Sequence, residues 1–116
     1  MAAYQAQNKK VSSCKCGPDY IDPMFHKEVL GVDSKNLDLF FSSEDELRKE
    51  YAKHAADAEL VITEGVMGYY DGLGGCSVKA SACDLAEVTD TPVILVVNTR
   101  GMSLSVLAYI KGFLTY

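Results

Sequence analysis

The chain alternates apolar runs with longer stretches of mixed polarity, and the apolar runs predict strands. Residues 11–15 (VSSCK) form a short run, and residues 59–65 (ELVITEG) form a longer one that reaches Glu64. Residues 91–98 (TPVILVVN) place five consecutive apolar residues after Pro92, a pattern typical of a strand that is buried on both faces. The sequence therefore predicts three strands within its first hundred residues.

Helical spacing marks the stretches between these runs. The clearest case begins at Ser43, which forms a capping box with Glu46 and precedes apolar residues at helical spacing. Residues 34–41 (SKNLDLFF) fit either an extended segment or a turn. The remaining predicted elements are the end of a helix at 2–10, one helical turn within 24–31, and helices at 77–88 and 102–116.

Strands that alternate with helices predict right-handed crossovers and a parallel α/β sheet. At 116 residues, the chain has the length of one domain. It begins inside a predicted helix and ends on another that has no cap. We therefore expect it to be part of a longer protein.

Composition and charge narrow the function classes. Hydrophobic residues make up 48% of the chain and charged residues 23%, as in soluble globular proteins. The net charge of −5 argues against non-specific binding to nucleic acid or to an anionic membrane. No apolar run approaches the roughly 18 residues of a membrane span, and no signal peptide opens the chain, so we expect a cytoplasmic protein. The four cysteines form no C-x-x-C pair and are expected to be reduced thiols rather than zinc ligands.

Four acidic residues follow the first two predicted strands. Asp19 and Asp22 lie in the segment KCGPDYIDPMFH, which holds two prolines; Glu64 ends the second strand, and Asp71 lies in the glycine-rich loop beyond it. Open α/β sheets bind ligands outside the carboxyl ends of their strands, so we expect these carboxylates on one edge. Carboxylates gathered there repel one another unless they share a cation, and Mg²⁺ takes one or two of them together with water and phosphate oxygens. The alternative interpretation is that the three aspartates are ordinary turn residues.

Two further features have more than one interpretation. The segment DGLGGCS either binds a phosphate through its backbone N–H groups or is only a flexible turn, and it matches neither G-x-x-x-x-G-K-[ST] nor G-x-G-x-x-G. His26 is placed either to bind a polar ligand or to make a local structural hydrogen bond. His54 lies within the helix predicted after Ser43 and is expected to be packed or solvated. The residues alone thus predict an α/β domain with an acidic, magnesium-binding edge.

Four segments resemble a known family. KCGPDYIDPMFH, SKNLDLFF, ITEGVMGYYDG and TPVILVVNTRGMSLSVLAYIKGF follow in the order found in the N-terminal synthetase domain of the cobyrinate a,c-diamide synthases. The resemblance runs from Ala2 to Phe113 and implies a P-loop NTPase-like fold similar to that of dethiobiotin synthetase. It departs from the family pattern because the first strand and its G-x-x-x-x-G-K-[ST] phosphate loop are not in this chain. Residues 1–116 would then be a partial ATP-dependent synthetase domain.

The resemblance also implies a reaction. In this family ATP phosphorylates the a and c acetate carboxylates of cobyrinate in cobalamin biosynthesis, and ammonia then displaces the phosphate to give amides. A C-terminal glutaminase domain, which is absent from this chain, releases the ammonia from glutamine. The implied assignment is a fragment of a carbon–nitrogen ligase, inactive alone, that uses Mg²⁺, ATP and a cobyrinate-type tetrapyrrole.

The family motifs imply roles for individual residues. Metal binding is implied for Glu64 and Asp22, and a part in catalysis for Asp19, Asp22 and Asp71. No nucleotide-binding residue is assigned, because the phosphate loop is absent. Contact with the ring substrate is implied for four residues near the same motifs: Tyr20, His26, Asn36 and Asp38.

Other interpretations stay open at this point. The same chemistry is compatible with hydrogenobyrinate or with the nickel tetrapyrrole of methanogens as substrate. A non-catalytic tetrapyrrole-binding module is the alternative from another class. The resemblance further places the absent strand between residues 60–64 and 93–97, which would leave strand edges unpaired and prone to association.

Overall fold

A three-stranded parallel sheet forms the centre of the protein, and the computed structural model describes all residues from 1 to 116. The strands are β1 (Val11–Cys16), β2 (Ser34–Leu37) and β3 (Leu60–Glu64). Their order in the sheet is β2-β1-β3, so the first strand of the chain is the central one. The predicted parallel α/β class is confirmed, and the ambiguous segment after residue 33 is a strand.

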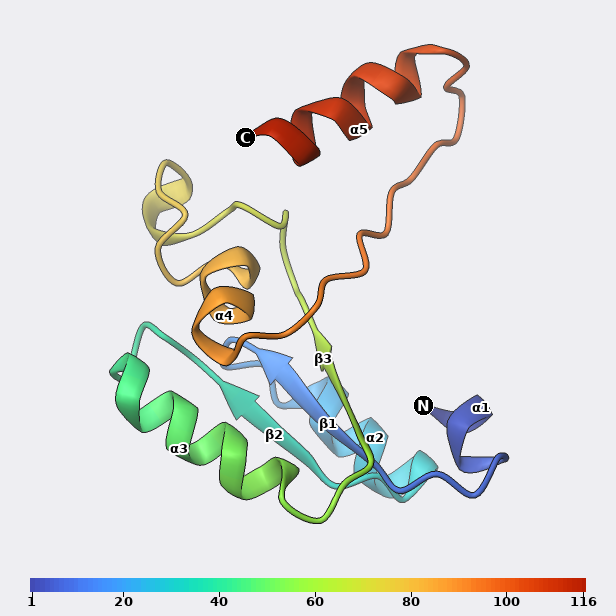
Figure 1. Cartoon of the computed structure of the whole chain (residues 1–116), viewed down its shortest axis with the longest axis vertical. Coiled ribbons are helices and arrows are strands. Elements are labelled where there is room, and N and C mark those ends of the chain that lie inside the picture. The colour runs from blue at the N-terminus through green and yellow to red at the C-terminus, as the bar shows by residue number, and fades with distance from the viewer.

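Helices cover both faces of this sheet. They are α1 (Ala2–Gln5), α2 (Ile21–Leu30), α3 (Glu44–Ala55), α4 (Ala82–Thr89) and α5 (Ser105–Thr115), with a 3₁₀ turn η1 at Leu73–Gly75. In Figure 1, α3 and α4 lie in front of the strands and α2 lies behind them, whereas α5 lies apart from the sheet at the end of a long extended segment. No helix combines the length and the apolar character that crossing a membrane requires.

The alternation of side chains along β1 separates an apolar face from a polar one. Cys14 is fully buried against α3 and α4, whereas Ser13 and Lys15 lie on the α2 side although both are also buried. The buried residues of the apolar face form the core: Cys14, Leu37, Leu47, Leu85 and Val88. The central strand therefore supplies the hydrophobic core with one set of residues and a polar layer with the other.

Helix α2 is longer than the single turn expected within 24–31. It starts at Ile21, so Pro23 occupies its first turn, where a missing N–H leaves no helical hydrogen bond unmade. It ends at Gly31, whose φ of 62° is the left-handed conformation that commonly terminates a helix. As a result Asp22 lies on the first turn of a helix and not in a loop.

The helix predicted after Ser43 is confirmed as α3, with both hydrogen bonds of the capping box in place. The helix predicted at 77–88 starts later, at Ala82. Ser81 caps it by accepting a hydrogen bond from the Asp84 N–H group. Residues 79 and 80 form a turn instead, in which Ala80 has a φ of 59°. A positive φ at Ala80 is incompatible with continuing the helix toward Ser77.

The strand predicted at residues 91–98 is not formed. This segment is extended but pairs with no strand, and the exposed fractions of Ile94 and Val96 are both 90%. The prediction of a doubly buried strand was wrong because burial needs a neighbouring strand and covering helices, and β3 pairs only with β1. An apolar run indicates a preference for burial. Whether the segment is buried depends on a neighbouring strand and on covering helices.

Candidate active site

The carboxyl edge of the sheet is organised around a buried lysine. Lys15 lies near the end of β1, and the exposed fraction of its side chain is only 3%. Its Nζ lies 3.3 Å from Glu64 Oε1 and 3.9 Å from Asp19 Oδ2, and it donates a hydrogen bond to Asp22. Three of the four acids predicted for this edge therefore meet at one ammonium group.

Each partner of Lys15 is positioned by a different element. Glu64 is the register partner of Lys15 on the neighbouring parallel strand, so the two side chains leave the sheet on the same face. Asp22 reaches Lys15 from the first turn of α2. Asp19 precedes that helix, where its Oδ1 accepts a hydrogen bond from the Ile21 N–H group at 2.9 Å. A strand, a helix and a loop thus converge on one point.

The charged groups of this cluster shift one another's pKa values. Burial alone would lower the pKa of Lys15, but hydrogen bonds to Asp22 and Glu64 outweigh it and raise the pKa above its ordinary value. The hydrogen bond from Lys15 is in turn the main reason why the pKa of Asp22 is lowered. Both pKa shifts favour the charged forms of Lys15 and Asp22, and such pairing is how a buried lysine keeps its charge.

His26 lies directly beneath this cluster on α2. The exposed fraction of its side chain is 8%, and its Nδ1 lies 3.1 Å from Ser13 Oγ and 3.3 Å from Ser34 Oγ. Its Nε2 faces Glu64, at 3.7 Å from Oε2. Of the two interpretations of His26, the structure provides the local hydrogen bonds and leaves little of the ring exposed for a substrate.

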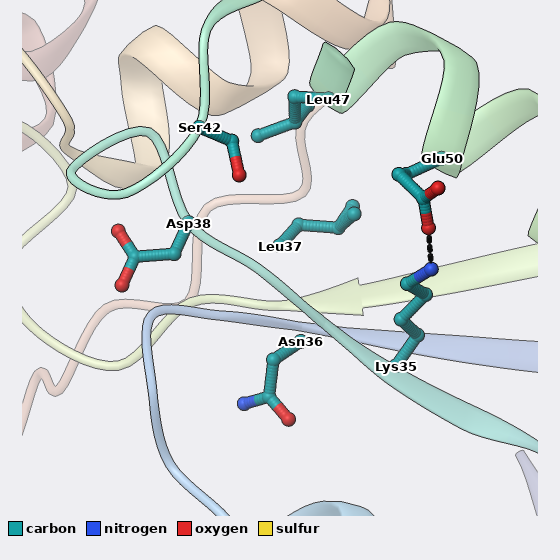
Figure 2. A pocket seen from close by; sticks show the side chains of 7 residues that line it. All are labelled: Lys35, Asn36, Leu37, Asp38, Ser42, Leu47 and Glu50. Atoms are coloured by element: carbon teal, nitrogen blue, oxygen red, sulfur yellow. Dashed lines mark ion pairs between the residues drawn. The ribbon is translucent and has the colours of Figure 1, made fainter.

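Asn36 and Asp38 come from β2 and the turn after it, at the side of a shallow cavity of about 250 Å³ (Figure 2). The Asn36 amide donates hydrogen bonds to the carbonyl oxygens of Gly17 and Asp19, at 2.7 Å and 2.6 Å. It therefore fastens the loop that carries Asp19. The Asp38 carboxylate accepts a hydrogen bond from the Phe40 N–H group at 2.8 Å and stabilises the following turn.

A larger cavity of about 430 Å³ opens between this loop and the glycine-rich loop after β3. Asp71 lines it together with Asp19 and Asp38 and does not join the Lys15 cluster. Its other walls are largely apolar and include the exposed rings of Phe40 and Phe41. Tyr20 is 72% exposed on the adjoining turn. The predicted acids thus divide between a charged cluster and a partly apolar cavity.

Three backbone donors of the segment DGLGGCS are used within the loop. The N–H groups of Gly72 and Leu73 donate to the carbonyl oxygens of Ser77 and Lys79, each at 2.9 Å. The N–H group of Gly75 donates back to Gly72 at 3.1 Å. Since these donors are used within the loop, its glycines form a turn, as the second interpretation of this segment predicted.

Comparison with known proteins decides the relationship. The chain is 40% identical over 113 residues to cobyrinate a,c-diamide synthase of Priestia megaterium, 38% over 114 residues to that of Methanocaldococcus jannaschii, and 43% over 114 residues to that of Listeria innocua. Each alignment covers 97% of this chain. The chain is therefore similar to one part of the cobyrinate a,c-diamide synthases. It spans about a quarter of the length of these curated relatives, since 25–26% of each is covered. No protein-family profile and no solved structure matches the chain.

Three of the four segments that resemble the cobyrinate a,c-diamide synthases build this edge of the sheet. GPDYIDP forms the loop that carries Asp19 and the first turn of α2, and ITEGVMGYYDG forms the end of β3 and one wall of the larger cavity. The NLD segment supplies the last two residues of β2 and Asp38, which begins the following turn. The motifs therefore meet in space although up to about 50 residues separate them in sequence.

Asp22 and Glu64, the residues for which metal binding is expected, both face the Lys15 ammonium. No group of three His, Cys, Asp or Glu side chains in residues 1–116 is arranged to hold a metal by itself. Asp22 and Glu64 nevertheless converge on one cation, the ammonium of Lys15, and two carboxylates are the number that Mg²⁺ commonly takes from a protein. Water and phosphate oxygens would supply the remaining ligands.

Sequence reasoning missed Lys15, which it treated only as the last residue of a strand. A usable signal was present, since Lys15 alternates with Ser13 on one face of a strand that is otherwise made of small residues. A lysine in a central strand is buried only when its charge is paired. The adjacent GPDYIDP segment holds two of the acids that pair with it.

Proposed function

We propose that this chain carries the edge of an ATP-dependent ligase at which a carboxylate of a cobyrinate-type tetrapyrrole is activated. The reaction would be amidation of the a and c acetates, with ammonia from glutamine hydrolysed by a glutaminase domain outside this chain. The observation that supports the proposal is the convergence of Lys15, Asp22 and Glu64 at the carboxyl edge of the sheet. The similarity to the cobyrinate a,c-diamide synthases suggests the reaction class.

The charges of the cluster fit this chemistry. An acetate that attacks the terminal phosphate of ATP brings two anions together, so fixed positive charge must offset their repulsion. Lys15 provides one such charge, but with Asp19, Asp22 and Glu64 the cluster has a net charge of −2. A divalent cation neutralises this charge, and bound Mg²⁺ supplies Lewis-acid stabilisation of phosphate oxygens. Asp22 and Glu64 would hold that ion, while Asp19 and Asp71 would orient the reacting groups.

The larger cavity is the proposed place for one edge of the ring. Its apolar wall at Phe40 and Phe41 suits a conjugated macrocycle, and Asp19 at its border connects it with the Lys15 cluster. A ring acetate in this cavity would lie near the positive charge of Lys15. Tyr20 is exposed beside it and is placed for a direct contact, whereas Asn36 would act by fastening the Asp19 loop.

A second candidate is a tetrapyrrole-binding role without catalysis. It is favoured by one observation, since the N–H groups of Gly72, Leu73 and Gly75 in the glycine-rich loop donate within the loop. We therefore expect the chain alone to bind Mg·ATP weakly and to form no amide. Hydrogenobyrinate and the nickel tetrapyrrole of methanogens are the alternative ring substrates.

A chimera tests the proposal. The matching 113-residue stretch of the Priestia megaterium relative is replaced by this chain, and amidated product is measured with cobyrinate, ATP, Mg²⁺ and glutamine. We expect an active chimera whose kcat falls about 100-fold or more after Lys15→Met or Glu64→Gln, the range seen when one charge-stabilising group is removed. Lys9→Met is the matched control, because Lys9 pairs with Glu59 on the surface away from the site.

The outcomes separate the two candidates. A folded chimera that keeps full activity without Lys15 and Glu64 contradicts the catalytic proposal. An inactive chimera, combined with tight binding of cobyrinate by the chain itself, favours the binding module. Cobyrinate binding is measured through quenching of tyrosine fluorescence, since the chain has seven tyrosines and no tryptophan.

A further inference from the structure

We propose that His26 is a positioning residue that fixes the Glu64 carboxylate beside Lys15 and does not itself contact substrate. The inference rests on the proposed function, in which Glu64 holds the metal ion. It starts from the two ring nitrogens of His26, which face different partners. Nδ1 faces two serine hydroxyls within the protein, and Nε2 faces Glu64.

The ring is held in place on its Nδ1 side. Ser13 is fully buried on β1, and Ser34, its register partner on β2, offers a second hydroxyl. Their oxygens lie 3.1 Å and 3.3 Å from Nδ1. Because the two serines belong to adjacent strands, the imidazole of α2 is fastened to the sheet at one point.

The charge of Glu64 selects the tautomer. A hydroxyl group can either donate or accept, so the serines are compatible with a proton on Nδ1 or without one. An unprotonated Nε2 would direct its lone pair at the Glu64 carboxylate, which is repulsive, whereas Nε2–H is attracted to it. The neutral ring therefore carries its proton on Nε2 and accepts a hydrogen bond from a serine at Nδ1.

This arrangement holds Glu64 from the side opposite to solvent. The Glu64 side chain is 45% exposed, and its Oε1 lies 3.3 Å from Lys15 while its Oε2 faces His26. Each oxygen thus faces a different nitrogen, and this favours one orientation of the carboxylate. Groups that orient a metal ligand in this way typically contribute about 10- to 100-fold to metal affinity.

Two substitutions of His26 test the contacts of its two ring nitrogens separately. In His26→Asn the amide takes the place of Nδ1 and keeps the serine contacts, and in His26→Gln it takes the place of Nε2 and keeps the contact with Glu64. His54→Asn is the matched control, because the His54 side chain is also 8% exposed and contacts Ser12 Oγ at 2.7 Å, but it comes from α3 and does not touch Glu64.

The first readout is Mn²⁺ binding by the chain, followed by electron paramagnetic resonance as a probe for the Mg²⁺ site. We expect His26→Asn to weaken binding about 10-fold, with His26→Gln and His54→Asn within about 2-fold of the unsubstituted chain. Equal effects of the Asn and Gln variants of His26, or no effect of either, would overturn the proposal. Urea unfolding of each variant checks that the fold is kept.

The second readout is the tautomer of His26, read from imidazole ¹⁵N shifts at a pH where the ring is neutral. We expect the Nε2–H form in the unsubstituted chain and a mixture after Glu64→Gln. A ring protonated on Nδ1 overturns the proposal even if no variant folds. If Glu64→Gln leaves Mn²⁺ affinity unchanged, the metal-binding role in the proposed function fails, while the tautomer still decides whether His26 positions Glu64.

Discussion

Lys15 and Glu64 are register partners on adjacent parallel strands, and their charged groups meet 3.3 Å apart at the carboxyl edge of the sheet. Parallel pairing places both side chains on the face covered by α2, where Asp22 and His26 complete their surroundings. The position of this charged pair is therefore set by backbone hydrogen bonds and not by flexible loops. Rigid elements hold a site more accurately than loops do.

Replacement of Lys15 by Met is expected to destabilise the fold. The substitution leaves three carboxylates without their shared cation, and their repulsion then opposes folding. Since these carboxylates are 31–45% exposed, water screens them, and we expect a loss of about 1 kcal/mol at pH 7, below the 3–5 kcal/mol of a fully buried pair. Urea unfolding measures this loss. A free energy of unfolding that rises at pH 7 contradicts the prediction.

Acid is expected to weaken the fold through Asp22. Its pKa is lowered in the folded state, chiefly by the hydrogen bond from Lys15, so Asp22 stabilises the fold above the pKa of the unfolded chain, about 3.9. That contribution is lost as the pH falls from about 4 through the lower pKa of the folded state. Urea unfolding between pH 2.5 and 7 should show a shallower acid decline for Asp22→Asn than for the unsubstituted chain. Asp57→Asn, far from the cluster, is the control and should leave the decline unchanged.

The four cysteines are expected to differ widely in reactivity. Burial raises the pKa of Cys14 to about 12 and also raises the pKa of Cys16, whereas Cys76 is exposed on the glycine-rich loop. Because the thiolate is the reactive form, iodoacetamide at pH 8 should modify Cys76 first and leave Cys14 intact until urea unfolds the chain. Peptide mass spectrometry over a time course measures the order. Early modification of Cys14 would show that β1 opens readily.

The exposed extended segment is expected to cause self-association. Ile94 and Val96 are each 90% exposed, and β3 has one unpaired edge. Such an edge is a template for strand pairing, so concentration-dependent oligomers are expected. Ile94→Lys together with Val96→Glu should reduce them without lowering the free energy of unfolding. Sedimentation velocity across a range of concentrations gives the result, and equal association of both proteins refutes the assignment.

Local signals predicted local structure well. Ser43 and Glu46 identified the start of α3 because a capping box needs only residues three apart. The carboxyl edge was also predicted, since Asp19, Asp22 and Glu64 each follow a recognisable strand. These predictions depended on chain neighbours or on a general rule for parallel sheets.

Contacts between residues far apart in the sequence explain the features that the sequence did not predict. Residues 91–98 have the composition of a buried strand, but their structure depends on a partner that composition cannot show. Lys15 was missed for the same reason, because its role comes from Glu64, a residue 49 positions away that only the sheet register brings close. Asp71 was grouped with the other acids by sequence, yet the turn at Gly68 and Gly72 directs it into the larger cavity instead.

The two-sided character of β1 has a consequence for how the protein can change. Alternate residues of this strand serve the core and the charged cluster, so a shift of one residue in its pairing would exchange the two sets. Cys14 would then face α2 and the lysine would enter the hydrophobic core, and both the fold and the site would be lost in one step. An insertion or deletion within β1 is therefore expected to abolish both the fold and the charged cluster. Selection for a stable protein also preserves the alignment of its reactive groups.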